Sequence, residues 1–171
     1  DKKNIGVKIK SPIELVAGIM RTFDVSFENY NQVIFIERAL GQVLFNPPNV
    51  AGWAGGKSWI DNSTLMLRLN LVAYLFNAGA INFTVKEELE AQKKNNPFRK
   101  IKASVNLKPI INQHEYLSQP QTFEALSNYL IQPKLSIQLE NISPFLVTRT
   151  KEGFIKSLLV RLMSLPEYQV C

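Results

Sequence analysis

Five side chains between residues 49 and 68 are of the types that bind ligands: Asn49, Trp53, Trp59, Asn62 and Arg68. A tryptophan ring presents a flat apolar face, and neighbouring amide and guanidinium groups supply hydrogen bonds. This combination suits a sugar ring or an extended peptide. In the structural alternative, both tryptophans pack into the protein and the asparagines bond to backbone groups in turns and caps. The sequence makes these five residues candidate ligand-binding residues and leaves both alternatives open.

Acid–base chemistry would have to come from Glu37 and Asp61, the carboxylates nearest to these residues. A two-carboxylate hydrolase needs both groups at one cleft with separated pKa values, and sequence spacing does not show this. Arg68 could meet a ligand carboxylate or pair with Asp61 or Glu37, and we prefer the internal ion pair. No catalytic residue is assigned.

Metal and nucleophile chemistry find little support in the sequence. His114 is the only histidine and Cys171 the only cysteine, and they lie far apart in the chain. Neither a zinc cluster nor a Cys–His pair is therefore indicated. Ser58, Ser63 and Ser104 have no histidine at an informative spacing. We expect no metal and no cofactor.

The net charge of +6 raises the question of an anionic partner. The stretch between Lys93 and Lys108 is basic, but it contains a single aromatic residue, Phe98, and no nucleic-acid-binding motif. A solvated charged loop explains it better than a nucleic-acid interface. No stretch approaches the ~18 apolar residues of a membrane span.

Helices are predicted at both ends of the chain. Ser11, Pro12 and Glu14 form a capping-box sequence that starts a helix over residues 12–23. Apolar residues at helical spacing predict a second helix over 30–45. A third is predicted to be capped by Asn62 or Ser63 and to end near Gly79, which suits a C-terminal cap.

The second half of the sequence is less regular. Residues 82–120 are predicted to be a polar insertion or irregular segment, followed by a helix over 121–131. The alternation in residues 134–142 fits a short strand or an extended loop. Thr150 can cap a last helix that begins at Lys151, with a terminal turn around Pro166.

These elements predict a mainly α fold. It would be an irregular bundle of five to six helices with a long Pro-, Gly- and Trp-rich loop, a polar insertion and room for one short β element. The length of 171 residues suits a single domain. An N-terminus without Met or a signal-peptide core indicates a piece of a larger protein.

The segment from Leu40 to Asn70 resembles a known family. It contains Gly41-Gln42, Pro47-Pro48-Asn49-Val50, Gly52-Trp53, Gly55-Gly56, Trp59-Ile60, Thr64-Leu65 and Arg68-Leu69-Asn70. This series is similar to the signature of the domain of unknown function 1800 family. The opening KSPIELVAGIMR and the closing LMSLPEYQ also resemble that family, so the likeness covers roughly half of the chain in three blocks.

The resemblance implies the C-terminal part of a mainly helical protein, usually bacterial and exported. The expected location is periplasmic, outer-envelope or secreted, and the expected partners are envelope proteins or polysaccharides. The family has no established activity, so no catalytic residue is carried over. The preferred interpretation is a non-catalytic structural or interaction module. The alternatives are a glycan-binding module and a hydrolase-related domain that uses the loop and helix of residues 46–70.

Overall fold

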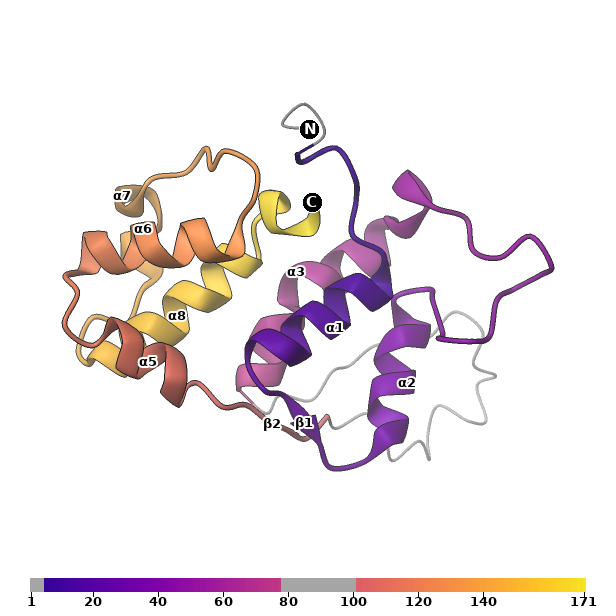
Figure 1. Ribbon diagram of the computed structural model, residues 1–171, viewed down its shortest axis with the longest axis horizontal. Coiled ribbons are helices and arrows are strands. Elements are labelled where there is room, and N and C mark those ends of the chain that lie inside the picture. Colours follow the sequence, from indigo (N-terminus) through magenta and orange to yellow (C-terminus); the bar gives the residue numbers. More distant parts are fainter. Residues whose placement is uncertain (1–4, 78–100) are drawn as a thin grey trace. The chain divides into compact units, whose positions relative to one another are not determined.

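The computed structural model describes residues 5–77 and 101–171 (Figure 1). This part of the chain contains seven α-helices and a two-stranded sheet, which confirms the mainly α prediction. The chain divides into two compact units. Unit 1 comprises Asp1–Ile9 with Asn106–Cys171, and unit 2 comprises Lys10–Val105. The single domain over 1–171 stays a prediction.

The first helix of unit 2, α1 (Pro12–Thr22), has the predicted capping box. The Ser11 hydroxyl accepts a hydrogen bond from the Glu14 N–H at 3.2 Å, and the Glu14 carboxylate accepts one from the Ser11 N–H at 2.7 Å. These two bonds satisfy backbone donors that the first turn of a helix otherwise leaves unpaired.

The second helix, α2 (Tyr30–Ala39), ends well before Phe45, so the predicted end is wrong. Gly41 adopts a left-handed φ of 90°, and its N–H donates to the Arg38 carbonyl while the Gln42 N–H donates to the Glu37 carbonyl. These two bonds form a Schellman cap, which terminates a helix at a left-handed glycine. The apolar run that continues to Phe45 belongs to a loop.

The third helix, α3 (Asn62–Phe76), is capped by Asp61 rather than by the predicted Asn62 or Ser63. Asp61 Oδ1 accepts from the N–H groups of Ser63 and Thr64, both at 2.8 Å. A carboxylate fits this position because it also meets the positive end of the helix dipole. The predicted cap Gly79 lies outside the described residues.

The core of unit 2 joins these helices to a small sheet. The rings of Phe23 and Phe76 meet edge to face, with centroids 5.1 Å apart. Strand β1 (Ser26–Phe27) pairs antiparallel with β2 (Ala103–Ser104). Helix α1 packs against α2, and α3 packs against β2.

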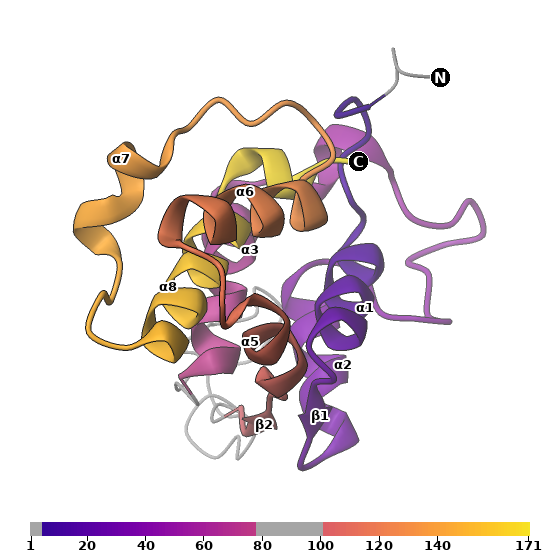
Figure 2. The ribbon, with the colours of Figure 1, turned by 60° about the vertical axis from the view of Figure 1, so that its left-hand side comes forward.

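Unit 1 is built around α8 (Lys151–Met163), whose apolar face is fully buried. The helices α5 (Lys108–His114) and α6 (Gln119–Leu130) pack on it, as Figure 2 shows. The predicted Thr150 cap is confirmed, because the Thr150 hydroxyl accepts from the Gly153 N–H at 3.0 Å. Helix α6 begins slightly earlier than predicted, because Ser118 and Gln121 form a capping box.

The remaining elements of unit 1 are short. They are α7 (Leu139–Ile142), a 3-10 turn η4 (Ser143–Phe145) and a 3-10 turn η5 (Pro166–Gln169). Residues 134–138 contain no helical, strand, turn or bend residue and lead directly into α7, so the predicted strand or extended loop over 134–142 is wrong for residues 139–142. Near the chain ends, Ile9 pairs with Val170 in an antiparallel bridge.

The predicted irregular segment 82–120 contains regular elements where the structure describes it. Residues 101–120 include β2, α5 and the first two residues of α6. The polar composition concealed α5, which buries only Ile110 and His114. The rest of the predicted segment lies outside the described residues. Within the described ranges, no helix is both long and apolar enough to span a membrane.

Candidate functional site

The loop from Leu40 to Asp61 connects α2 to α3 and projects away from the helices of unit 2 in both views (Figures 1 and 2). Its only regular element is the 3-10 turn η2 (Gly56–Trp59). Four of its residues have left-handed φ values: Gly41 at 90°, Phe45 at 62°, Gly52 at 85° and Gly56 at 65°. Three of the four are glycines, which adopt such angles without steric cost.

Side chains of unit 2 fix the start of this loop. The buried Glu37 carboxylate accepts a hydrogen bond from the Leu44 N–H at 3.1 Å. The Gln42 side-chain oxygen accepts one from the Ile13 N–H, at 3.2 Å, in the first turn of α1. The beginning of the loop is therefore held by two side chains rather than by packing alone.

The tip of the loop is a turn organised by Asn49. Its side-chain oxygen accepts from the Ala51 N–H at 2.8 Å, and its carbonyl accepts from the Gly52 N–H at 3.1 Å. This is an Asx turn, which mimics a backbone turn with a side chain. Asn49 thus bonds to backbone groups in a turn, as the structural alternative to ligand binding predicts.

The two tryptophans are both half-buried. Trp59 ends η2, and its carbonyl accepts a hydrogen bond from the Thr64 hydroxyl at 3.1 Å. Asn62 is exposed as the first residue of α3. Each ring retains some exposed surface on the same loop as the exposed Asn49.

Arg68 lies in the interior, with 1% of its surface exposed. Its Nη1 donates to the Lys10 carbonyl at 3.0 Å, while Nε and Nη2 have no hydrogen-bond partner in the part of the chain that the structure describes. Burial lowers the pKa of Arg68. The predicted ion pair with Asp61 or Glu37 is therefore wrong, because Asp61 caps α3 and Glu37 holds the loop.

Sequence reasoning missed the exposed apolar side chains of the loop. Leu44, Phe45 and Val50 are all exposed, and Phe45 is 90% exposed. The helical spacing of the apolar run up to Phe45 placed Leu44 on the buried face of a helix that ends earlier. The available signal was Gly41, which suits a helix C-terminus.

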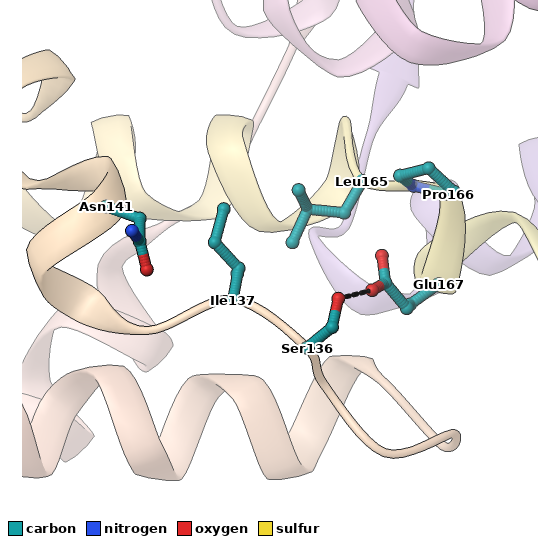
Figure 3. Close-up of a pocket in the computed structure, with 6 residues that line it drawn as sticks. All are labelled: Ser136, Ile137, Asn141, Leu165, Pro166 and Glu167. Carbon is teal, nitrogen blue, oxygen red and sulfur yellow. Dashed lines mark hydrogen bonds between the residues drawn. The ribbon is translucent and has the colours of Figure 1, made fainter.

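A second candidate site lies in unit 1, where a cavity of about 430 Å³ opens beside η5 (Figure 3). Ser136 and Glu167 point toward each other, and the Ser136 hydroxyl donates to Glu167 Oε1 at 2.5 Å. Ile137, Leu165 and Pro166 supply apolar walls, and Asn141 lies at the far end. The closing block LMSLPEYQ contains three of these lining residues, but sequence reasoning did not identify them as a site.

The hydrogen bond from Ser136 lowers the pKa of Glu167, and burial only partly opposes this effect. The backbone N–H groups of Glu167 and Ser136 also lower the pKa of Glu167. A carboxylate with a lowered pKa is ionised at neutral pH, so Glu167 cannot serve there as a general acid. It can bind a cation or accept hydrogen bonds.

We expect Glu167→Gln to reduce stability at neutral pH but not in acid. A lowered native pKa stabilises the fold above the ordinary glutamate value of about 4.3, and this contribution is lost as the pH falls through the native pKa. The stability difference between the two proteins should therefore close in acid. Urea unfolding across a pH series measures it.

The matched control is Ser136→Ala, which removes the strongest cause of the shift and leaves the carboxyl in place. An NMR titration should then give Glu167 a higher pKa than in the unchanged protein. An unaltered Glu167 titration in Ser136→Ala would contradict the assigned cause.

Among residues 5–77 and 101–171, no group of three or more His, Cys, Asp or Glu side chains is placed to hold a metal ion. A search of the curated proteins and of the solved structures finds no match. The family described as Protein of unknown function (DUF1800) matches residues 1–170. Since the match covers nearly the whole sequence, the chain belongs to the DUF1800 family.

Proposed function

We propose that this chain is a non-catalytic interaction module that presents the loop between α2 and α3 to another protein. The observation that carries the proposal is the exposure of Leu44, Phe45 and Val50 on that loop. Covering one such side chain gains about 1.5–3 kcal/mol. Three exposed apolar side chains on one loop offer apolar surface that another molecule can cover.

The fixed conformation of the loop supports the same function. Glu37, Gln42 and Asn49 hold its start and its tip through hydrogen bonds. A loop that is ordered before binding loses less conformational entropy when a partner covers it. Phe45 keeps a left-handed φ of 62°, a conformation that costs of order 1 kcal/mol for a residue other than glycine. The ring of the same residue is 90% exposed.

The carboxylates of this region favour a binding role over a hydrolase role. Asp61 accepts hydrogen bonds from the first turn of α3, and Glu37 accepts one from the Leu44 N–H. Both carboxylates are therefore engaged in hydrogen bonds to the backbone, which favours a structural role for them over an acid–base role.

A glycan-binding module is the second candidate. The half-buried Trp53 and Trp59 and the exposed Asn49 and Asn62 support it. We place either activity in the envelope of a bacterium or outside the cell, a proposal that rests on the family resemblance.

The experiment places the photo-crosslinking residue p-benzoylphenylalanine at position 45 of the full-length protein in its native host. Position 30 is the matched control, because Tyr30 is an aromatic residue of the same unit that is 73% exposed. We expect a protein adduct of defined mass from position 45 and none from position 30.

Two other outcomes would count against the proposal. Equal adducts from both positions would indicate non-specific contact with neighbouring proteins. Absence of protein adducts, together with binding to a glycan array that Trp53→Ala or Trp59→Ala abolishes, would establish the glycan-binding alternative.

A further inference from the structure

The cavity beside η5 combines a carboxylate, an amide and apolar walls. Figure 3 shows Ile137 and Leu165 between Asn141 at one end and Glu167 at the other. The cavity volume of about 430 Å³ lies within the range of roughly 300–1,000 Å³ that is typical of small-molecule sites. Apolar walls with a polar group at each end suit a ligand whose aliphatic part joins two polar groups.

The Glu167 carboxylate has no cation beside it in the part of the chain that the structure describes. Hydrogen bonds lower its pKa, burial partly opposes them, and no charged neighbour contributes to the shift. The carboxylate is ionised at neutral pH, and its negative charge is therefore available to a ligand. A cationic group is the partner that this end of the cavity favours.

The Ser136 hydroxyl decides which kind of cation fits. It donates its hydrogen to Glu167 Oε1 at 2.5 Å, so the lone pairs of its oxygen remain able to accept. A guanidinium group binds a carboxylate best through both oxygens, and here the hydroxyl already bonds to one of them. An ammonium group donates from a single nitrogen, and it can bond to the second Glu167 oxygen and to the Ser136 oxygen together.

A divalent metal ion fits this end of the cavity less well. Such ions prefer several oxygen ligands, and within residues 5–77 and 101–171 no group of three acidic, His or Cys side chains is placed to supply them. The apolar walls would also gain nothing from a metal ion. Methylene groups attached to an ammonium would instead remove the surfaces of Ile137, Leu165 and Pro166 from water.

Asn141 provides a hydrogen-bond donor at the far end. Its side-chain oxygen accepts from the Gln138 N–H at 3.1 Å. Its NH₂ group has no partner among the described residues, so it can donate to an oxygen of a ligand. The three parts of the cavity thus match an ammonium group, an aliphatic chain and an oxygen acceptor, in that order.

We propose that this cavity binds an alkylammonium ion that carries an oxygen acceptor at the other end of its aliphatic chain. The ammonium group bonds to Glu167 and Ser136, the chain contacts Ile137 and Leu165, and the acceptor takes a hydrogen bond from Asn141. A lysine side chain of another protein and a free amine both have this chemistry. The site lies in unit 1 and does not use the loop of unit 2, so this proposal and the proposed function can fail separately.

The first experiment uses the unaltered chain and 5-aminopentanamide, which has an ammonium group and an amide oxygen at the two ends of an aliphatic chain. An NMR titration follows the backbone N–H signals of Ser136, Ile137, Asn141 and Glu167. We expect saturable shifts of these signals at millimolar concentrations. Pentanamide, which lacks the ammonium group, should bind about tenfold more weakly or less well still.

A second ligand, Nα-acetyl-lysine methylamide, separates the two sources of the ammonium group. Binding at least as tight as that of 5-aminopentanamide would assign the site to a lysine side chain of another protein. Weaker binding would assign it to a free amine, because the added peptide groups would not fit. Either result supports an alkylammonium site.

Two variants test the carboxylate. Glu167→Gln keeps the shape of the side chain, removes its charge and should weaken binding of 5-aminopentanamide about tenfold or more. Glu140→Gln is the matched control, because Glu140 is an exposed carboxylate next to Asn141 that does not line the cavity. It should change binding by less than about twofold, since salt screens exposed charges.

Three results would overturn the proposal. They are equal binding of pentanamide and 5-aminopentanamide, equal losses of binding in Glu167→Gln and Glu140→Gln, and absence of saturable shifts in the unaltered chain. The first and the third need no variant, so the test holds even if Glu167→Gln does not fold.

Discussion

Replacement of Arg68 by Ala is expected to lower the free energy of unfolding by about 3 kcal/mol, whereas replacement by Met should change it by no more than about 1 kcal/mol. Alanine leaves a cavity where one of the largest fully buried side chains stood. Methionine fills most of that space and removes a buried charge whose one hydrogen bond within residues 5–77 and 101–171 is to the Lys10 carbonyl. Urea denaturation of the three proteins gives both differences.

The test is the difference in stability between Arg68→Ala and Arg68→Met. A structural role for the Arg68 side chain predicts that its volume matters and that its charge does not. If Arg68→Met lost as much stability as Arg68→Ala, the guanidinium group would have to make hydrogen bonds in solution beyond the bond to Lys10. Addition of small carboxylates would then show whether an anion supplies them.

Replacement of Phe23 by Ala should lower the free energy of unfolding by about 3–5 kcal/mol. The side chain is 0% exposed, and its ring meets Phe76 edge to face. Aromatic pairs of this kind add about 0.5–1.5 kcal/mol beyond the area that they bury. Fluorescence of Trp53 and Trp59, which belong to the same unit, follows the unfolding transition.

Phe45→Ala is the matched control, because it removes the same side chain from an exposed position of the same unit. It should change stability by less than about 0.5 kcal/mol. Phe45→Gly should raise stability, because glycine adopts the φ of 62° without steric cost. A loss from Phe45→Ala as large as that from Phe23→Ala would mean that the ring is packed in solution, and would remove the basis of the proposed function.

Local signals in the sequence predicted the starts of α1 and α8. The capping boxes and hydroxyl caps at Ser11 and Thr150 act through neighbours three residues away, so the sequence contains both partners. The end of α2 was predictable in principle from Gly41. The apolar residues at helical spacing, however, continue past this glycine, and this periodicity led to the longer predicted helix.

The candidate sites depend on contacts that sequence spacing does not contain. Arg68 bonds to Lys10 from a distant part of the chain, and Glu167 accepts from Ser136 across a long separation. The pairing of β1 with β2 joins residues 26 and 104, which share no local pattern. The five predicted ligand residues were chosen by type, and the structure places them in different environments: exposed, half-buried and fully buried.

The bridge between Ile9 and Val170 has a consequence for the order of events on the ribosome. Unit 1 takes residues from both sides of unit 2 in the sequence, so the segment 5–9 leaves the ribosome long before its partners. All of unit 2 is translated in the interval. Because compact units fold as they emerge, unit 2 can be native while residues 5–9 still await Val170. Residues 106–171 thus complete a unit to which residues 5–9, translated before unit 2, also belong.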